Sequence, residues 1–311
     1  MTLILPIRGP MIDAGEPNWG TTLTAPFGSP FSRRLLRPVS VVTRVGDAGV
    51  AMIKFVYPDP ATLLTPEAGG AHVQSRYPTR EVDHRGTSGI VLAVDLSTLV
   101  ALARQHDGTI EFAPQVGDFV AVEEPLFILY GGATAIDDRE LRPTVAFGPE
   151  RTLEQDPIFA FRIIVDIALK ALSPAINDPT TAVLALDQVQ RLLRTVGRRK
   201  LRGEVISDTS GQPRLIFRTP NWEDYVRIAC REIRACGANN LQVARRMRAM
   251  LEELQRTLPE HRRAALQEEL SLLNRAIESN FQYPEDLALA RIADSQGLGA
   301  SSSERSTGPN R

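Results

Sequence analysis

The pattern of apolar and polar positions changes near residue 71, from turn-rich to periodic. Residues 1–70 contain stretches rich in Pro, Gly and Thr, such as "GEPNWGTTLTAPFGSPF" and "YPDPATLLTPEAGG", with no long periodic segment. Within them, the apolar alternation of "VSVVTRV" is typical of a strand. The pattern therefore predicts an irregular N-terminal segment over residues 1–70 without a core of its own.

Residues 71–149 predict a small β-rich unit. "SGIVLAVD" has the apolar, β-branched character of a strand, and Asp95 is placed to cap a following helix that ends at Gly108. "TIEFAP" and "FVAVEEPLFILYGG" read as further strands, with "QVGD" as a turn. "PQVGDFVAVEEPLFIL" resembles the barrel-sandwich hairpin of biotinyl and lipoyl carrier domains. Carriers attach their cofactor to a lysine, and no lysine lies between Lys54 and Lys170, so the resemblance leaves a carrier-like fold without carrier function.

Residues 150–293 predict a mostly helical unit. "QDPIFAFRIIVDIALKAL" and "DPTTAVLALDQVQRLLRTV" have helical apolar spacing, and further helical patterns follow residue 220, the last beginning at Pro284. A hairpin near residues 204–218 turns at Ser210-Gly211, and residues 294–311 have the composition of a disordered tail. The fold class is α+β: a small β-rich, barrel-sandwich-like unit, then a mostly helical unit with one β-hairpin.

Composition excludes several function classes. The net charge of −1 gives no global attraction to nucleic acid or anionic lipid. Two cysteines and four scattered histidines match no metal-site or disulfide spacing, so we expect no metal, no cofactor and a cytoplasmic setting. No apolar window of about 18 residues lacks a charge, which predicts a soluble chain without a transmembrane helix. Gly-x-Ser-x-Gly, Rossmann and phosphate-loop motifs are also missing, so the sequence favours a non-enzymatic protein.

The first helix of the helical unit carries a charged stripe. Arg162, Asp166 and Lys170 are spaced i, i+4 and i+8 and therefore share one helical face. Apolar residues surround them, which indicates a largely buried helix. Two interpretations remain open: a solvent-facing ladder of ion pairs, or a polar seam facing a pocket or partner.

The segment "ALSPAINDPTTA" also has two interpretations. Pro174 ends the preceding helix, Asn177 tolerates a left-handed conformation, and Asp178 before Pro179 is a typical cap at a helix start. These residues account for a tight corner between two helices. Alternatively, the polar groups at this helix start hold a cation or a hydroxyl-bearing ligand.

The densest basic stretch is "RLLRTVGRRKLR", Arg191–Arg202. It makes nucleic-acid binding an alternative function. No aromatic residue is interleaved with it, and no nucleic-acid-binding module is recognisable, which favours a solvated helix end. The same reasoning applies to "RRMRAM" near Arg245.

The segment "ERTLEQDPIFAFRIIVDIALKALSPAINDPTTA", residues 150–182, resembles the signature of a bacterial family of predicted membrane proteins, domain of unknown function 2254. We call it the signature segment. "GIVLAVD", "VGDFVAVEEPL", Asp224-Tyr225 and "IRACGANN" are similar to further elements of that family, so the resemblance covers about residues 71–290. Ala175 departs from the family's usual glycine. The resemblance also implies several membrane helices before this domain, and residues 1–66 contain none, so we expect an offshoot or a membrane part that lies elsewhere.

The resemblance suggests that the polar residues of the signature segment gather around one polar centre or ligand site. The candidates are Arg151, Gln155, Asp156, Arg162, Asp166, Ser173, Asn177, Asp178 and Thr181. The leading hypothesis is a non-enzymatic ligand-sensing, regulatory or assembly module. Its expected partners are a membrane protein or a second copy, and an unknown small ligand, with no nucleic acid. The alternative is a hydrolase-like enzyme that uses Asp156, Asp166 or Asp178 as acid, base or metal ligand.

Overall fold

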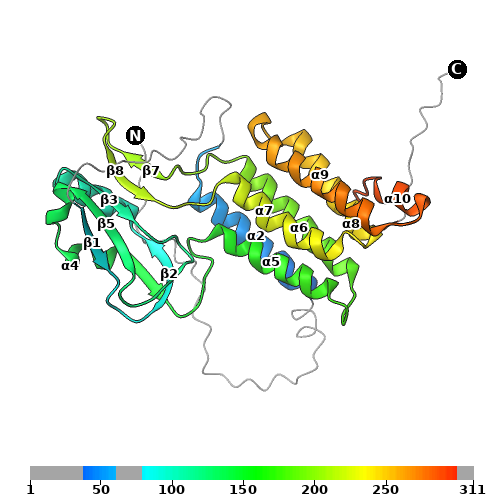
Figure 1. Cartoon of the computed structure of the whole chain (residues 1–311), viewed down its shortest axis with the longest axis horizontal. Coiled ribbons are helices and arrows are strands. Elements are labelled where there is room, and N and C mark those ends of the chain that lie inside the picture. The colour runs from blue at the N-terminus through cyan, green and yellow to red at the C-terminus, as the bar shows by residue number, and fades with distance from the viewer. Residues whose placement is uncertain (1–37, 61–78, 300–311) are drawn as a thin grey trace. The chain divides into compact units, whose positions relative to one another are not determined.

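The computed structural model describes residues 38–60 and 79–299 (Figure 1). These residues form two compact units: a β-rich unit of residues 79–159 and 201–220, and a helical unit of residues 38–60, 160–200 and 221–299. All the described strands lie in the β-rich unit and most of the described helices lie in the helical unit, which confirms the α+β class.

The β-rich unit contains two sheets. The five-stranded sheet has the order β1 (Thr79–Asp83), β5 (Pro125–Gly131), β3 (Gly108–Phe112), β8 (Pro213–Phe217) and β7 (Val205–Ser207). The three-stranded sheet has the order β4 (Phe119–Val120), β2 (Gly89–Val94) and β6 (Val145–Gly148). Among the described strands the sheets are open and do not close into a barrel, so the barrel-sandwich expectation is corrected to two separate sheets.

The predicted hairpin is present but belongs to the other unit. β7 and β8 pair antiparallel, with Gly211 in a left-handed conformation at the turn (φ 82°). β8 also pairs in parallel with β3, so that Leu215 lies opposite Ile110. The hairpin was assigned to the helical unit because of its neighbours in the chain. It joins the β-rich unit because Leu215 and Phe217 are buried in that unit's core.

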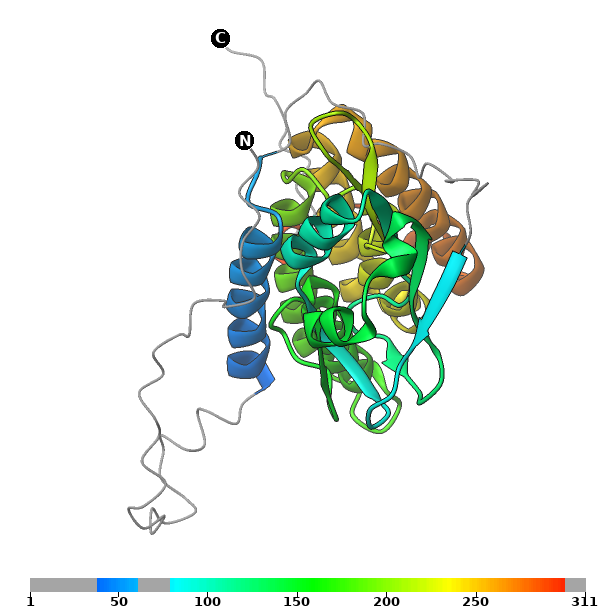
Figure 2. The same ribbon diagram turned by 90° about the vertical axis from the view of Figure 1, so that its left-hand side faces the viewer.

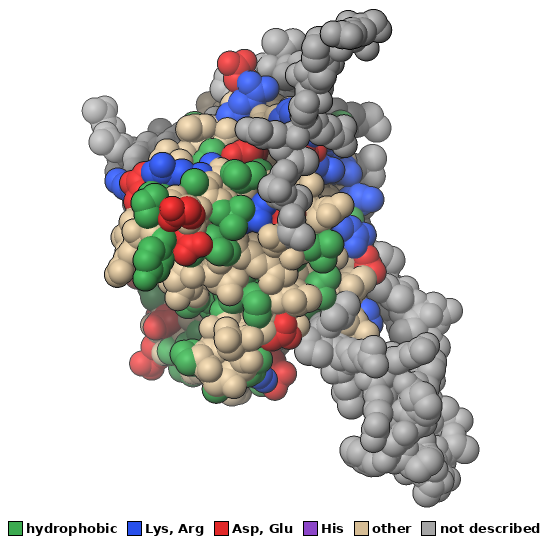
Figure 3. Space-filling model, turned by 90° about the vertical axis from the view of Figure 1, so that its right-hand side faces the viewer, with side chains coloured by type: hydrophobic (Ala, Val, Ile, Leu, Met, Phe, Trp, Pro, Cys, Tyr) green, Lys and Arg blue, Asp and Glu red, His purple; other side chains and the backbone are tan. Residues whose placement is uncertain are grey.

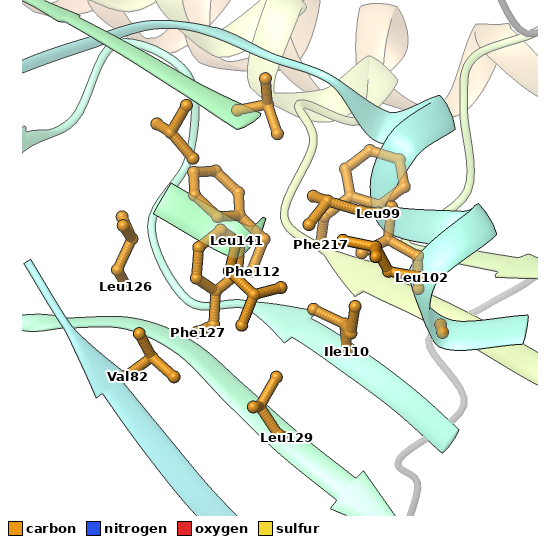
Figure 4. Packing of buried hydrophobic residues seen from close by; sticks show 14 of the residues in the cluster. Val82, Leu99, Leu102, Ile110, Phe112, Leu126, Phe127, Leu129, Leu141 and Phe217 are labelled. Carbon is orange, nitrogen blue, oxygen red and sulfur yellow. The ribbon is translucent and has the colours of Figure 1, made fainter. Parts of the chain in front are cut away.

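The core of the β-rich unit is formed by buried residues of both sheets and of helix α3 (Leu96–Gln105), several of which are shown in Figure 4. Asp95 caps α3 as predicted, because its side chain accepts hydrogen bonds from the backbone N–H groups of Ser97 and Thr98. The left-handed residue after the helix is Asp107 (φ 47°), whereas Gly108 begins β3. A Cβ at Gly108 would lie 2.1 Å from the backbone nitrogen of Ala133, so this glycine provides room rather than a helix stop. The short helix α4 (Asp138–Leu141) and single 3-10 turns at Gly132–Ala135 and Arg142–Thr144 complete the unit.

Helix α2 (Pro38–Val56) lies where an irregular segment with a strand was expected. Its buried positions, Val42, Gly46, Gly49 and Ile53, follow helical spacing. The two glycines are contact positions: a Cβ at Gly49 would lie 2.8 Å from Cβ of Ala160 and 2.9 Å from Cδ2 of Leu192. Leu192 belongs to α6 (Pro179–Gly197), and α2 therefore packs closely beside α6, as Figure 2 shows in blue and green.

The rest of the helical unit follows the predicted order. Its helices are α5 (Pro157–Leu172), α6 (Pro179–Gly197), α7 (Trp222–Gly237), α8 (Leu241–Thr257), α9 (Arg263–Asn280) and α10 (Pro284–Ala290), with a 3-10 turn at Glu260–Arg262. α8 contacts both α6 and α9. The predicted tail begins too early, because Asp294 is fully buried and Gly297 is buried. Residues 300–311 lie outside the described residues, as do residues 1–37 and 61–70 of the expected N-terminal segment and residues 71–78 of the expected β-rich unit.

Candidate functional site

The first group of signature residues surrounds the start of α5. The carboxylate of Asp156, only 4% exposed, pairs with Arg151, and its Oδ1 accepts a hydrogen bond from the backbone N–H of Phe159 at 3.1 Å. Gln155 Oε1 accepts a hydrogen bond from the backbone N–H of Val94 at 3.3 Å. Burial raises the pKa of Asp156, and the opposing effect of Arg151 does not reverse this. Asp156 therefore caps α5, and Gln155 ties the preceding loop to β2.

Sequence reasoning predicted the "QVGD" turn but missed that the Arg151 side chain lies against it. Gly117 has φ 93°, and a Cβ there would lie 2.3 Å from Nη2 of Arg151. The glycine is thus required both for its backbone conformation and for the room it leaves to the arginine. The "QVGD" turn signalled the conformation, but its spatial neighbour is 34 residues further along the chain.

The second group lies on the outer face of α5. Arg162 pairs with Asp166 at 2.5 Å and with Glu232 of α7 through two hydrogen bonds of 2.6 and 3.1 Å. The hydrogen bonds that Arg162 donates to Glu232 raise the pKa of Arg162 and lower the pKa of Glu232. Asp166 is 60% exposed along its side chain, and Lys170 is also exposed. The arrangement matches the solvent-facing ladder of ion pairs on α5. Glu232 of α7 adds an acidic partner that the helical spacing of α5 could not reveal.

The third group forms the corner between α5 and α6. Asn177 has φ 47°, the left-handed conformation predicted for it, and its N–H donates to the carbonyl of Ser173 at 2.9 Å. Asp178 caps α6: it accepts hydrogen bonds from the backbone N–H of Thr181 at 3.0 Å and from its Oγ1 at 2.6 Å. Both bonds lower the pKa of Asp178. Ala175 keeps an ordinary negative φ, so the corner does not require glycine at that position.

The structure does not bring these groups around one polar centre. Asp156 precedes α5 and Asp178 follows it, and the 16 residues of the helix span about 24 Å. Arg162 and Asp166 lie along the helix between them. The single centre suggested by the resemblance is therefore corrected to three separate local networks. The first and third networks cap helix ends, and the second links the outer face of α5 to α7.

The basic stretch at the C-terminal end of α6 is largely engaged. Arg191 pairs with Asp47 at 2.6 Å, Arg194 pairs with Glu253 at 3.0 Å, and Arg199 donates to the carbonyl of Pro58 at 2.8 Å. These contacts offset much of the continuous positive charge that binding along a nucleic-acid backbone would use.

The other basic run, "RRMRAM", is not the solvated surface that was expected. Arg245, Arg246 and Arg248 are 1%, 6% and 8% exposed. Arg246 bonds to Asp187 of α6, and Arg248 bonds to Asn274 of α9. Helical periodicity alone did not reveal this burial, because the acceptors lie on helices distant in sequence. The run fixes α8 between its neighbours.

The part of the chain that the structure describes contains neither a metal site nor a reactive buried thiol. No group of three or more His, Cys, Asp or Glu side chains there is placed to hold a metal ion. Burial raises the pKa of the Cys230 thiol, which keeps it protonated and unreactive. The described residues therefore contain no recognisable metal centre, and Cys236 is the exposed one of the two cysteines.

The comparisons with known proteins identify a family of predicted membrane proteins. The model of the family described as "Predicted membrane protein (DUF2254)" matches residues 32–253. Uncharacterized proteins of Mycobacterium bovis and Mycobacterium tuberculosis are each 31% identical over 210 residues. These alignments cover 65% of this chain and 40% of each relative's length.

No solved structure matches the chain. Across residues 38–60 and 79–299, none of the helices is long and apolar enough to cross a membrane. The family match extends over most of the chain and includes the whole signature segment together with α2 and the β-rich unit. The chain belongs to the DUF2254 family of predicted membrane proteins.

Proposed function

We propose that this chain is a non-enzymatic, cytoplasmic regulatory or assembly module that works with an integral membrane protein. One observation carries the proposal: the three aspartates of the signature segment already make structural bonds. Asp156 caps α5 and pairs with Arg151, Asp166 pairs with Arg162, and Asp178 caps α6. A general acid or base must reach a proton of its substrate, whereas these carboxylates are committed to backbone groups and arginines.

The signature segment is suited to holding a surface in one shape. Its first part fixes where α5 begins, and its last part fixes how the chain turns from α5 into α6. Caps and a left-handed turn residue specify such a geometry more strictly than apolar packing alone. The polar residues of the signature segment then need no catalytic role. They hold α5 and α6 in a fixed arrangement, and the helical unit presents its exposed faces in that arrangement.

The membrane partner is supported by the family. Its members are described as predicted membrane proteins, and this chain spans 40% of the length of the matched mycobacterial relatives. We infer that the module acts next to membrane-embedded segments, whether these are part of a longer chain or a separate polypeptide.

The test is a rebinding experiment with purified chain and membranes from the cells that naturally make it. We expect the chain to sediment with washed membranes and to lose this binding when the membranes are first treated with protease. Vesicles made from the extracted lipids, without protein, serve as the control and should not bind. A chain that stays in the supernatant, or that binds the protein-free vesicles equally well, would contradict the proposal.

A further inference from the structure

A cleft in the helical unit lies outside the signature segment. It has a volume of about 510 Å³ and is lined by Gln190 and Arg194 of α6, by Arg246 and Arg256 of α8, and by Ala293 and Ser295 of the segment that follows α10. The volume falls within the range of small-molecule sites, about 300–1,000 Å³. The cleft is thus large enough for a metabolite or a lipid headgroup.

Most of the residues that line the cleft are charged or polar, and besides the arginines they include Glu252 and Glu253. Figure 3 views the helical unit from the α10 side, and its hydrophobic side chains form small groups separated by polar and charged ones. Inside the cleft, Arg194 Nη2 lies 3.0 Å from Glu253 Oε1, and Arg256 Nε lies 3.1 Å from Glu253 Oε2. Glu252 pairs with Arg248 at 3.3 Å. Because the Glu253 carboxylate is shared between two guanidinium groups, these three side chains carry an excess of positive charge.

The arginines of the cleft have donors left over. A guanidinium carries five N–H donors. In the described structure Arg194 donates one hydrogen bond, to Glu253, and Arg256 donates two, to the same residue. Arg246 donates through Nε and Nη2, to Asp187 and Gln190. Guanidinium groups with free donors match the oxygens of phosphate in number and direction.

The outer wall of the cleft is held in place. Arg245 donates from Nε to the carbonyl of Ile292 at 3.0 Å and from Nη1 to that of Gly299 at 2.9 Å. The carboxylate of Asp294 accepts hydrogen bonds from the backbone N–H groups of Gln296, Gly297 and Gly299. These bonds fix residues 292–299, so the wall that includes Ala293 and Ser295 exists before a ligand arrives. A wall that is already ordered lowers the entropy cost of binding.

We propose that this cleft binds a phosphate group through Arg194 and Arg256, and that Glu253 occupies the phosphate position when no ligand is bound. The phosphate displaces the Glu253 carboxylate from between the two guanidinium groups, with Ser295 and Gln190 as further polar partners. Ala249 and Ala293 provide an apolar surface for the part of the ligand that carries no charge. The proposal goes beyond the membrane-partner function and does not depend on it.

The first experiment is calorimetric titration of the full chain with inorganic phosphate at constant ionic strength. We expect Arg256→Gln to weaken binding about fivefold, because it removes one charged donor at an exposed position where solvent reduces its contribution. Arg256 is 76% exposed along its side chain, so this variant should fold normally. Arg275→Gln removes an exposed arginine of α9 outside the cleft and should leave binding unchanged.

Glu253→Gln gives a prediction of opposite sign. It removes the internal competitor and should strengthen phosphate binding, whereas Glu285→Gln, at an exposed position of α10, should not. If Arg256→Gln binds as tightly as the wild type, or if Glu253→Gln does not strengthen binding, the assignment of the cleft is overturned.

Sedimentation with vesicles distinguishes the two sources of a phosphate group. Phosphatidylcholine vesicles with and without phosphatidic acid are compared for the wild type and for Arg256→Gln. Binding that requires phosphatidic acid and Arg256 identifies a lipid headgroup as the ligand. Binding of inorganic phosphate without vesicle binding identifies a small soluble phosphate compound. Binding of neither probe overturns the proposal. Protease treatment of membranes does not affect this assay, so it can fail independently of the membrane-partner proposal.

Discussion

Replacement of Asp178 by alanine should destabilise the helical unit by about 2 kcal/mol. Loss of a helix N-cap costs about 1 kcal/mol, and the change also removes the acceptor of the Thr181 hydroxyl at 2.6 Å. Thr181 is only 8% exposed, so its hydroxyl is left without a partner at a cost of about 1 kcal/mol or more. Asp178→Asn retains an acceptor for the Thr181 N–H and should cost less than about 1 kcal/mol.

The measurement is urea unfolding followed by far-UV circular dichroism, with Asp178→Asn as the matched control. The pKa of Asp178 is lowered in the folded chain from its ordinary value of 3.8 by its bonds to Thr181. Its stabilising contribution is therefore complete above that ordinary value and is lost as the pH falls through the folded value. The difference between wild type and Asp178→Ala should narrow below about pH 4. A loss under about 0.5 kcal/mol at neutral pH would refute the capping role.

Three further predictions concern packing, surface charge and thiols. Gly49→Val should destabilise the chain by about 1–3 kcal/mol in urea unfolding, because a Cβ at this position would lie within 3 Å of side chains of α5 and α6. An unchanged unfolding midpoint would disprove the close approach of α2 to these two helices. Glu232→Gln should cost less than about 1 kcal/mol in the same assay, since the ion pair with Arg162 is partly exposed; a loss above about 2 kcal/mol would indicate a buried network instead. Maleimide should label Cys236 alone in the native chain and Cys230 only after unfolding, because Cys230 is buried and its pKa is raised; rapid native labelling of both thiols would contradict this packing.

Local signals predicted the corner of the signature segment correctly. Pro174, Asn177 and Asp178 each act within a few residues of their own position, so the sequence contains the full physical reason for the turn and the cap. Asp95 before α3 is predictable for the same reason. Caps and turns are the features that a single sequence specifies most directly.

Contacts between distant segments could not be predicted in the same way. The contact role of Gly46 and Gly49 was not predicted, because close approach to α6 is a property of two helices together. The parallel pairing of β3 with β8 joins segments about a hundred residues apart, and no local pattern indicates it. The partners of Arg162 and of the buried arginines in α8 lie on other helices, so spacing along one helix revealed only half of each network.

The central claim is that the carboxylates of the signature segment serve structure and not chemistry. The most direct measurement is hydrolysis of phosphoester, ester and peptide substrates by the purified chain, compared between the wild type and Asp178→Asn, with membrane rebinding measured on the same samples. The account predicts no turnover above buffer for either protein, together with equal rebinding. Turnover by the wild type that disappears in a folded Asp178→Asn variant would contradict it.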